Sequence, residues 1–203
     1  MFINIDGPNG VGKTTTVNGV ARVLESKGYT VKIVHFHRRG TLIGDAIQQV
    51  LNGETTLNKE SLQMLYAADM LDFTKEELPK LQGSYDVIIA DRYYTSSIAI
   101  GMAIGIDAEA LKTFHSYDAK PDVNFILTAS TEEILKRVSM QRNVPGQTGD
   151  IFEQKMNHIK IIDSYRNLKN ETGGIEEIDV NVSTDIGIKS IVSKITNKLK
   201  YSK

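Results

Sequence analysis

Short apolar runs alternate with stretches of helical periodicity along the whole chain. Five runs rich in apolar and β-branched residues, at 2–6, 30–36, 86–90, 123–127 and 175–180, predict five strands. Between them, apolar residues recur three or four positions apart, which predicts helices. These helical stretches cover about residues 13–28, 41–53, 58–81, 98–104, 107–117, 130–140 and 152–169, and a last one follows residue 184.

Strands that alternate with helices favour a parallel sheet with helices on both faces. We therefore expect an α/β fold of three layers, in which a five-stranded parallel sheet lies between two layers of helices. The pattern shows no internal repeat and no composition break that would mark a linker. Residues 1–203 are accordingly predicted to form a single domain.

Several helix ends carry local signals. Thr41 has the side chain of an N-cap, and Ser130 with Glu133 resembles a capping box. Pro79 lies inside the stretch at 58–81 and is expected to kink or end that helix. The polar, glycine-bearing segment at about 141–151 breaks the periodicity and predicts a loop that acts as a lid.

Composition excludes several classes of function. The net charge of −1 argues against nucleic acid as a partner, and no apolar run is long enough to cross a membrane. The chain contains no cysteine, which excludes disulfides and cysteine zinc sites. The N-terminus lacks the charged-then-apolar pattern of a secretion signal, so we expect a cytoplasmic protein.

Residues 7–14 match the pattern G-x-x-x-x-G-K-[ST], and they lie between a predicted strand and a predicted helix. Glycines allow backbone N–H groups to approach phosphates closely, and the helix N-terminus adds partial positive charge. An ordinary glycine-rich turn is the alternative, but the complete pattern in this setting favours a nucleoside triphosphate site. We expect the nucleoside triphosphate to contact Gly7, Pro8, Asn9, Gly10, Val11, Gly12, Lys13, Thr14, Thr15 and Arg137. An exposed helix residue is the alternative for Arg137.

Asp91 and Arg92 directly follow the apolar strand at 86–90. A carboxylate at that point can hold Mg²⁺ together with the Thr14 hydroxyl, and an arginine can grip a phosphate through two N–H groups. A surface ion pair is the alternative for Asp91 and Arg92. Because ligands bind beyond the carboxyl ends of parallel strands, we favour Thr14 and Asp91 as the Mg²⁺ ligands.

Further arginines lie on other predicted loops. Arg39 and Arg92 could clamp a second phosphorylated substrate, whereas Arg38 is as easily a solvated turn residue. Arg142 lies in the expected lid and would deliver positive charge to a transferring phosphoryl group. Catalysis is therefore assigned to Lys13, Asp91, Arg92 and Arg142.

These motifs, in this order, resemble the thymidylate kinases among the P-loop nucleoside-monophosphate kinases. The resemblance rests on the loop at 7–14 and on the segments 39–44, 65–69, 91–99 and 137–153. It implies the P-loop NTPase fold, ATP on the glycine loop, and a homodimer that packs through the 58–81 helix. It further implies an acceptor site built from Asn9, Arg39, Tyr66, Met70, Arg92, Ser96 and Ser97, with Tyr66 stacked on a pyrimidine.

Three positions depart from the family pattern. Asn9 replaces an acidic residue that contacts the acceptor sugar, Met70 replaces an arginine that reads thymine, and Ile100 replaces a tyrosine near the sugar. All three affect the acceptor and none affects ATP. Because a site without a polar reader loses discrimination, the hypothesis is that thymidylate specificity is relaxed or redirected.

The predicted function is transfer of the ATP γ-phosphoryl group to a (deoxy)nucleoside 5′-monophosphate, with dTMP as the leading acceptor and Mg²⁺ as the cofactor. A nucleoside kinase is one alternative, which the pair Arg39 and Arg92 disfavours. A nucleotide-dependent switch is the other. It is disfavoured because the chain has no N-K-x-D element to read guanine.

Overall fold

The computed structural model describes residues 1–142, 158–172 and 174–201. Five parallel strands form one sheet, as predicted, and their order in it is β2-β3-β1-β4-β5. They are β1 (Phe2–Asp6), β2 (Val31–His35), β3 (Val87–Asp91), β4 (Val123–Thr128) and β5 (Ile175–Asp179). The carboxyl ends of β1, β2 and β3 are adjacent, since Asp91 is paired with both Ile5 and His35.

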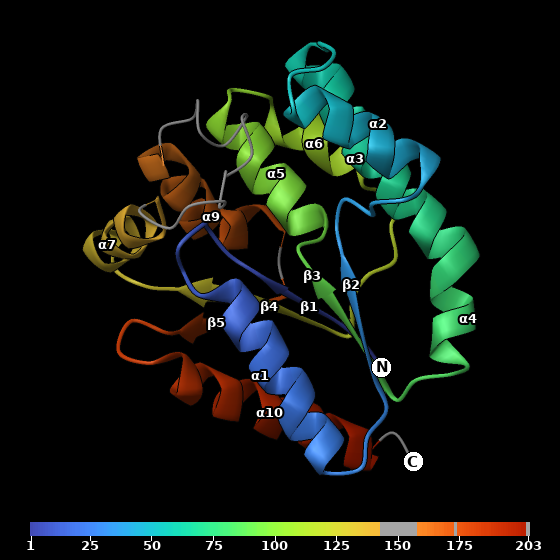
Figure 1. The fold of residues 1–203 in the computed structure, drawn as a ribbon, viewed down its shortest axis with the longest axis vertical. Coiled ribbons are helices and arrows are strands. Elements are labelled where there is room, and N and C mark those ends of the chain that lie inside the picture. Colours follow the sequence, from blue (N-terminus) through green and yellow to red (C-terminus); the bar gives the residue numbers. More distant parts are fainter. Residues whose placement is uncertain (143–157, 173, 202–203) are drawn as a thin grey trace.

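Helices connect the strands and cover both faces of the sheet (Figure 1). In the described residues they are α1 (Lys13–Ser26), α2 (Leu42–Leu51), α3 (Lys59–Asp72), η1 (Phe73–Glu77), α4 (Leu78–Gln82), α5 (Tyr94–Ala103), α6 (Ala108–Phe114), α7 (Thr131–Arg142), α9 (His158–Thr172) and α10 (Thr184–Tyr201). No helix in these ranges is both long enough and apolar enough to span a membrane.

Alternate residues of each central strand face different layers. Ile3 and Ile5 of β1 pack against α1 and α10, which lie side by side on one face (Figure 1). Phe2 of β1 and Ile88 of β3 point to the other face, where α3, α5, α6 and α9 supply the partners. The two cores cover both faces of the sheet, so a ligand-binding site can form only at the ends of the strands.

Some helix boundaries differ from the prediction. The stretch at 58–81 does not end at Pro79, because the π-helical turn η1 leads into α4 and places the proline in the first turn of that helix, where its missing N–H is tolerated. Helix α5 begins at Tyr94, four residues earlier than expected. Its first turn is buried through hydroxyl groups that the apolar pattern does not detect. Residues 152–157 of the predicted 152–169 helix lie outside the described residues.

The predicted N-caps agree with the structure more closely than the predicted helix boundaries do. Thr41 accepts a hydrogen bond from the Gly44 amide, which confirms it as an N-cap. Ser130 accepts from the Glu133 amide at 3.2 Å, but the Glu133 side chain bonds Arg137 instead of closing the box. Half of the predicted capping box is therefore present.

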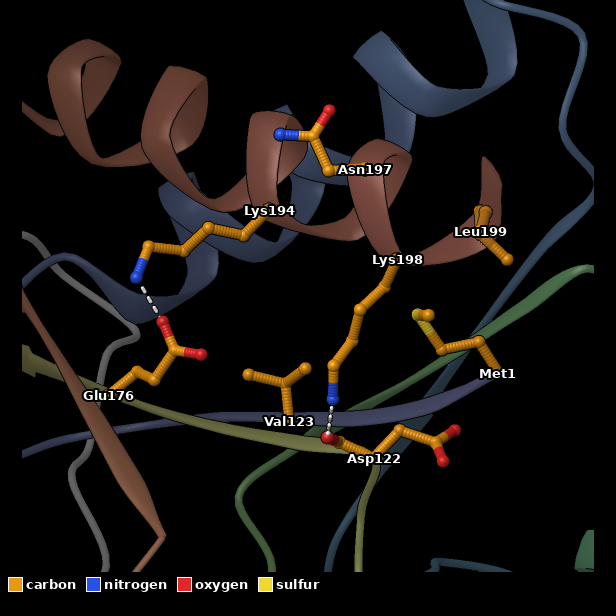
Figure 2. Close-up of a pocket in the computed structure, with 8 residues that line it drawn as sticks. All are labelled: Met1, Asp122, Val123, Glu176, Lys194, Asn197, Lys198 and Leu199. Atoms are coloured by element: carbon orange, nitrogen blue, oxygen red, sulfur yellow. Dashed lines mark hydrogen bonds and ion pairs between the residues drawn. The ribbon is translucent and has the colours of Figure 1, made fainter. Parts of the chain in front are cut away.

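A cavity of about 680 Å³ lies at the amino ends of the strands, between the starts of β1 and β4 and the end of α10 (Figure 2). Its two lysines already have acceptors: Lys194 pairs with Glu176, and Lys198 donates to the Asp122 carbonyl at 2.6 Å. No residue of the glycine loop lines it. Ligands of parallel sheets bind at the opposite, carboxyl ends, so the site is sought there.

Candidate active site

The loop between β1 and α1 has the backbone of a phosphate cradle. Gly7, Gly10 and Gly12 have positive φ angles of 145°, 82° and 102°. Lys13 folds its ammonium group back onto the Gly7 and Pro8 carbonyls, at 2.7 and 2.9 Å. Thr14 follows in the first turn of α1, and its side chain is exposed. This loop offers amide groups, a helix N-terminus and one ammonium group to an anion.

Arg137, on α7, lies against the same loop. Its guanidinium group donates to the Val11 carbonyl at 3.1 Å and to the Val180 carbonyl at 3.0 Å, while Nε donates to Glu133 at 2.7 Å. Arg137 is thus a half-buried bridge between the glycine loop and the end of β5, and its predicted contact with ATP stays a prediction. A donor nucleotide on the loop would meet this bridge.

Asp91, the last residue of β3, faces the loop lysine. Burial acts to raise its pKa, but a 3.0 Å hydrogen bond with His35 and the charges of Lys13 and Arg92 outweigh burial and hold the pKa below its usual value. Asp91 is therefore a carboxylate at neutral pH. It is well suited to accept Mg²⁺ or water.

Arg92 joins the glycine loop to α5. Its backbone adopts φ 66°, a left-handed conformation that is uncommon for a residue with a side chain and occurs at functional sites. One end of its guanidinium group bonds the Asn9 side-chain oxygen, and the other donates to Ser96 Oγ at 3.3 Å. Arg92 thus lies between the predicted donor and acceptor sites.

Asp6 organises this region, and sequence reasoning missed it. Its carboxylate is fully buried and accepts hydrogen bonds from the Gly7 amide and the hydroxyls of Thr95, Ser96 and Tyr165, at 2.6 to 2.8 Å. These donors belong to the glycine loop, α5 and α9. Asp6 therefore fixes the strand end to both helices that flank Arg92.

A second cavity, of about 180 Å³, opens beside Arg92. Its lining combines predicted acceptor residues with others that were not predicted: Phe36, His37, Gln63, Tyr66, Met70, Arg92, Ser96, Ser97 and Ile100. The Tyr66 ring lies 6.2 Å from that of His37, which burial keeps at a pKa below its usual value. The volume is below the roughly 300–1,000 Å³ of drug-sized sites, and it suits one ring of a larger ligand.

The adjacent arginines Arg38 and Arg39 have different surroundings. Arg38 is 8% exposed and binds Asp69, Asp72 and Glu77, which holds the loop after β2 against α3 and η1. Arg39 is exposed, and it is not among the residues that line the acceptor cavity. Arg38 is therefore a structural residue, while the predicted phosphate clamp by Arg39 stays a prediction.

Other predictions fall partly outside the described residues. The lid at about 141–151 begins at the end of α7, and its residues from 143 onward are not described. Arg142 is the last residue of α7, but its side chain is also outside the described part of the chain. Its proposed catalytic role stays a prediction.

One further missed residue, Gln63, left a signal in the sequence. It lies three positions before Tyr66 and seven before Met70, so all three residues share one face of α3. A polar residue on that otherwise apolar stripe indicates a buried partner or a ligand. His37 and Phe36 carry no comparable signal, because they reach the cavity only through the bend after β2.

Known proteins were compared with this chain. The family model described as "Thymidylate kinase" matches residues 5–191. The chain belongs to the thymidylate kinase family. A probable thymidylate kinase of Methanocaldococcus jannaschii is 34% identical over 174 residues, which cover 84% of this chain and 82% of that protein. One from Methanosphaera stadtmanae is 29% identical over 204 residues, or 98% of this chain and 100% of that protein.

A solved structure agrees with the fold. The thymidylate kinase of Candida albicans superimposes with a TM-score of 0.70 and 24% identity, over 98% of this chain and 92% of that one. Family membership makes this chain an ATP-dependent nucleoside-monophosphate kinase, with dTMP as the leading candidate acceptor. The fold is that of the P-loop NTPases, as the resemblance implied.

Proposed function

We propose that this protein transfers the γ-phosphoryl group of ATP to the 5′-phosphate of dTMP and of at least one other nucleoside monophosphate. Arg92 is the observation that carries the proposal. Its guanidinium group bonds Asn9 in the glycine loop and Ser96 at the acceptor cavity. A single arginine thus reaches both phosphate sites, as transfer between two bound nucleotides requires.

The donor side supplies positioning and charge. Phosphoryl transfer needs little covalent chemistry from the protein, so Lys13 and Arg92 act by stabilising negative charge on the phosphates. Lys13 can exchange the Gly7 and Pro8 carbonyls for phosphate oxygens without leaving the loop. Arg142 would add charge from the lid.

The residues present fit Mg²⁺. The carboxylate of Asp91 and the hydroxyl of Thr14 are hard oxygen donors, and the low pKa of Asp91 keeps it ionised. An ion there would complete its coordination with phosphate oxygens and water, as Mg²⁺ commonly does. Mg²⁺ bound there would neutralise phosphate charge. Lys13 and Arg92 would orient the same phosphates.

Apolar groups on the acceptor side support relaxed specificity. Met70 is buried beside the cavity and Ile100 lines it, and neither side chain can hydrogen-bond a base or a sugar. Asn9 directs its side-chain oxygen to Arg92. The acceptor sugar therefore has fewer hydrogen-bonding side chains around it than in a site with a carboxylate in place of Asn9 and a tyrosine in place of Ile100.

The test measures acceptor-dependent ATP consumption with Mg²⁺ against ribo- and deoxynucleoside monophosphates and nucleosides, with products separated by chromatography. We expect diphosphates from dTMP and from at least one other monophosphate, and no product from nucleosides. Lys13→Met should abolish turnover, while Lys27→Met, an exposed lysine just beyond the same helix, should not. Turnover of nucleosides alone, or ATP hydrolysis that ignores acceptors, would refute the proposal.

We also infer a homodimer through α3. Met64 on this helix is 56% exposed and Leu57, just before it, is 42% exposed, which leaves apolar surface for a second copy. Light scattering after size exclusion should give twice the mass of the 22.5 kDa chain. Met64→Glu should shift it to the monomer mass. A monomeric wild-type protein would contradict this inference.

A further inference from the structure

Gln63 and Ser97 form a buried pair at the inner wall of the acceptor cavity. Gln63 comes from α3 and is 1% exposed, and Ser97 comes from α5 and is 4% exposed. The Ser97 hydroxyl donates to the Gln63 side-chain oxygen at 2.5 Å, and both residues line the cavity. Within the described residues this is the only hydrogen bond of the Gln63 side chain.

That bond leaves a defined pattern of groups for a ligand. A serine hydroxyl has one proton, and here Gln63 takes it, so Ser97 can only accept further hydrogen bonds. The Gln63 oxygen is occupied, so its NH₂ group can only donate. The pair therefore presents one acceptor beside one donor. A ligand in the cavity that supplies an acceptor would give this NH₂ group a partner.

The other polar groups of the cavity are committed elsewhere. The Ser96 hydroxyl donates to Asp6 at 2.6 Å and contacts Tyr165. His37 bonds Gln48 at 3.0 Å, and Arg92 bonds the glycine loop. The remaining wall consists of apolar or aromatic groups, including Met70 and Tyr66. Gln63 and Ser97 are thus the groups placed to distinguish one ring from another.

The pattern complements one class of base. A pyrimidine with a carbonyl at C4 carries an N3–H donor beside the O4 acceptor, which matches the Ser97 acceptor and the Gln63 donor. Cytosine carries the reverse arrangement, since its N3 accepts and its N4 amino group donates. Neither group of the pair senses the substituent at C5. In the orientation of the pair that the structure shows, thymine and uracil both fit and cytosine does not.

We propose that Gln63, oriented by Ser97, selects 4-keto pyrimidine monophosphates and takes over the base-reading role that Met70 cannot perform. The proposal rests on the proposed kinase function. It limits the relaxed specificity to the 5-substituent and the sugar, while the 4-keto group is still required. Guanine has the same donor–acceptor edge, so dGMP is one of the acceptors that test the proposal.

The first measurement compares kcat/KM of the wild-type enzyme for dTMP, dUMP, dCMP and dGMP. We expect dTMP and dUMP to agree within about 10-fold, since they differ by one methyl group. We expect dCMP to be at least about 100-fold poorer, because it leaves both buried groups of the pair mismatched. Equal turnover of dTMP and dCMP, or a preference for dCMP or dGMP, would overturn the proposal.

The second measurement uses Gln63→Glu, which keeps the shape and the Ser97 hydrogen bond but removes the donor. The dTMP-to-dCMP ratio should fall by about 10- to 100-fold, mostly through a higher KM for dTMP, because the base is remote from the transferred group. Gln49→Glu, an exposed glutamine on α2, should leave the ratio unchanged. An unchanged ratio in Gln63→Glu would also overturn the proposal.

Direct binding keeps the test independent of turnover. Calorimetric Kd values for dTMP and dCMP, measured on the same variants, should show the same fall in selectivity even if Gln63→Glu transfers phosphate slowly. Failure of the wild-type enzyme to phosphorylate any monophosphate would refute the kinase proposal itself. Phosphorylation without selection between dTMP and dCMP would refute only the role of Gln63.

Discussion

Replacing Arg38 with methionine tests whether Arg38 stabilises the fold, in contrast to the adjacent Arg39. Asp69 is fully buried, and it accepts from Arg38 Nε at 2.9 Å and from the Arg38 backbone amide at 3.0 Å. Asp72 and Glu77 are 46% and 40% exposed at their side chains, so each of those pairs adds at most about 1 kcal/mol. The main cost comes from Asp69, which would keep only the backbone donor.

Breaking a buried pair from one side costs about 3–5 kcal/mol. That is a large part of the roughly 5–15 kcal/mol by which domains are stable, so Arg38→Met should lower the urea midpoint strongly. Methionine keeps an unbranched apolar stem but also removes the guanidinium group that lies 5.8 Å from the centre of the Phe73 ring. Adding Asp69→Asn should recover at least about 1 kcal/mol, because the amide can still accept from the backbone without a buried charge.

Arg39→Met is the matched control. Arg39 is exposed, so its loss should change the free energy of unfolding by no more than about 0.5 kcal/mol. If it clamps the acceptor phosphate, KM for the monophosphate should rise instead. A loss of under 1 kcal/mol in Arg38→Met, or no rescue by Asp69→Asn, would refute the structural role of the pair.

Two further predictions concern the carboxylates of the site. The hydrogen bond with Asp91 raises the pKa of His35, whereas burial lowers that of His37, so NMR titration should find them on opposite sides of 6.5. The stabilising His35–Asp91 pair is complete between about pH 3.8 and 6.5, is lost as pH rises through the raised His35 pKa, and is lost as pH falls through the lowered Asp91 pKa. Asp91→Asn should bring His35 back towards 6.5, and an unmoved His35 would contradict the pairing. Tyr165→Phe removes one donor from buried Asp6 and should cost about 1.5–3 kcal/mol in urea unfolding, whereas Tyr117→Phe, 74% exposed, should cost nothing measurable.

The donor half of the site was predictable from sequence because backbone geometry builds it. A glycine loop after a strand needs particular residue types at fixed spacing, so Gly7 to Thr14 identify it without any distant contact. The apolar run at 86–90 predicted a buried strand, and Asp91 and Arg92 follow at its carboxyl end. That position is also a local feature of the sequence. The sheet and most helices were predicted from the spacing of hydrophobic residues alone.

The acceptor half was predictable only in part, because separate elements supply its side chains. Gln63, Ser97 and His37 come from α3, α5 and the bend after β2, and only folding brings them to one cavity. Asp6 ends an apolar run and gives no sign that three hydroxyls converge on it. Arg38 and Arg39 look equivalent in the sequence, and only the burial of Asp69 shows which of them serves the fold.

This difference in construction explains where the chain departs from its family. Exchanging a glycine of the loop would alter the backbone conformation expected to hold ATP, whereas Asn9, the one departure inside the loop, exchanges only a side chain. The acceptor cavity is a set of side chains on rigid helices, and exchanging one of them alters what binds and leaves the donor loop in place. Met70 and Ile100 are such exchanges. If Gln63 selects the base, α3 has lost a reader at one position and carries another two turns earlier on the same face, and the chemistry at Arg92 is untouched.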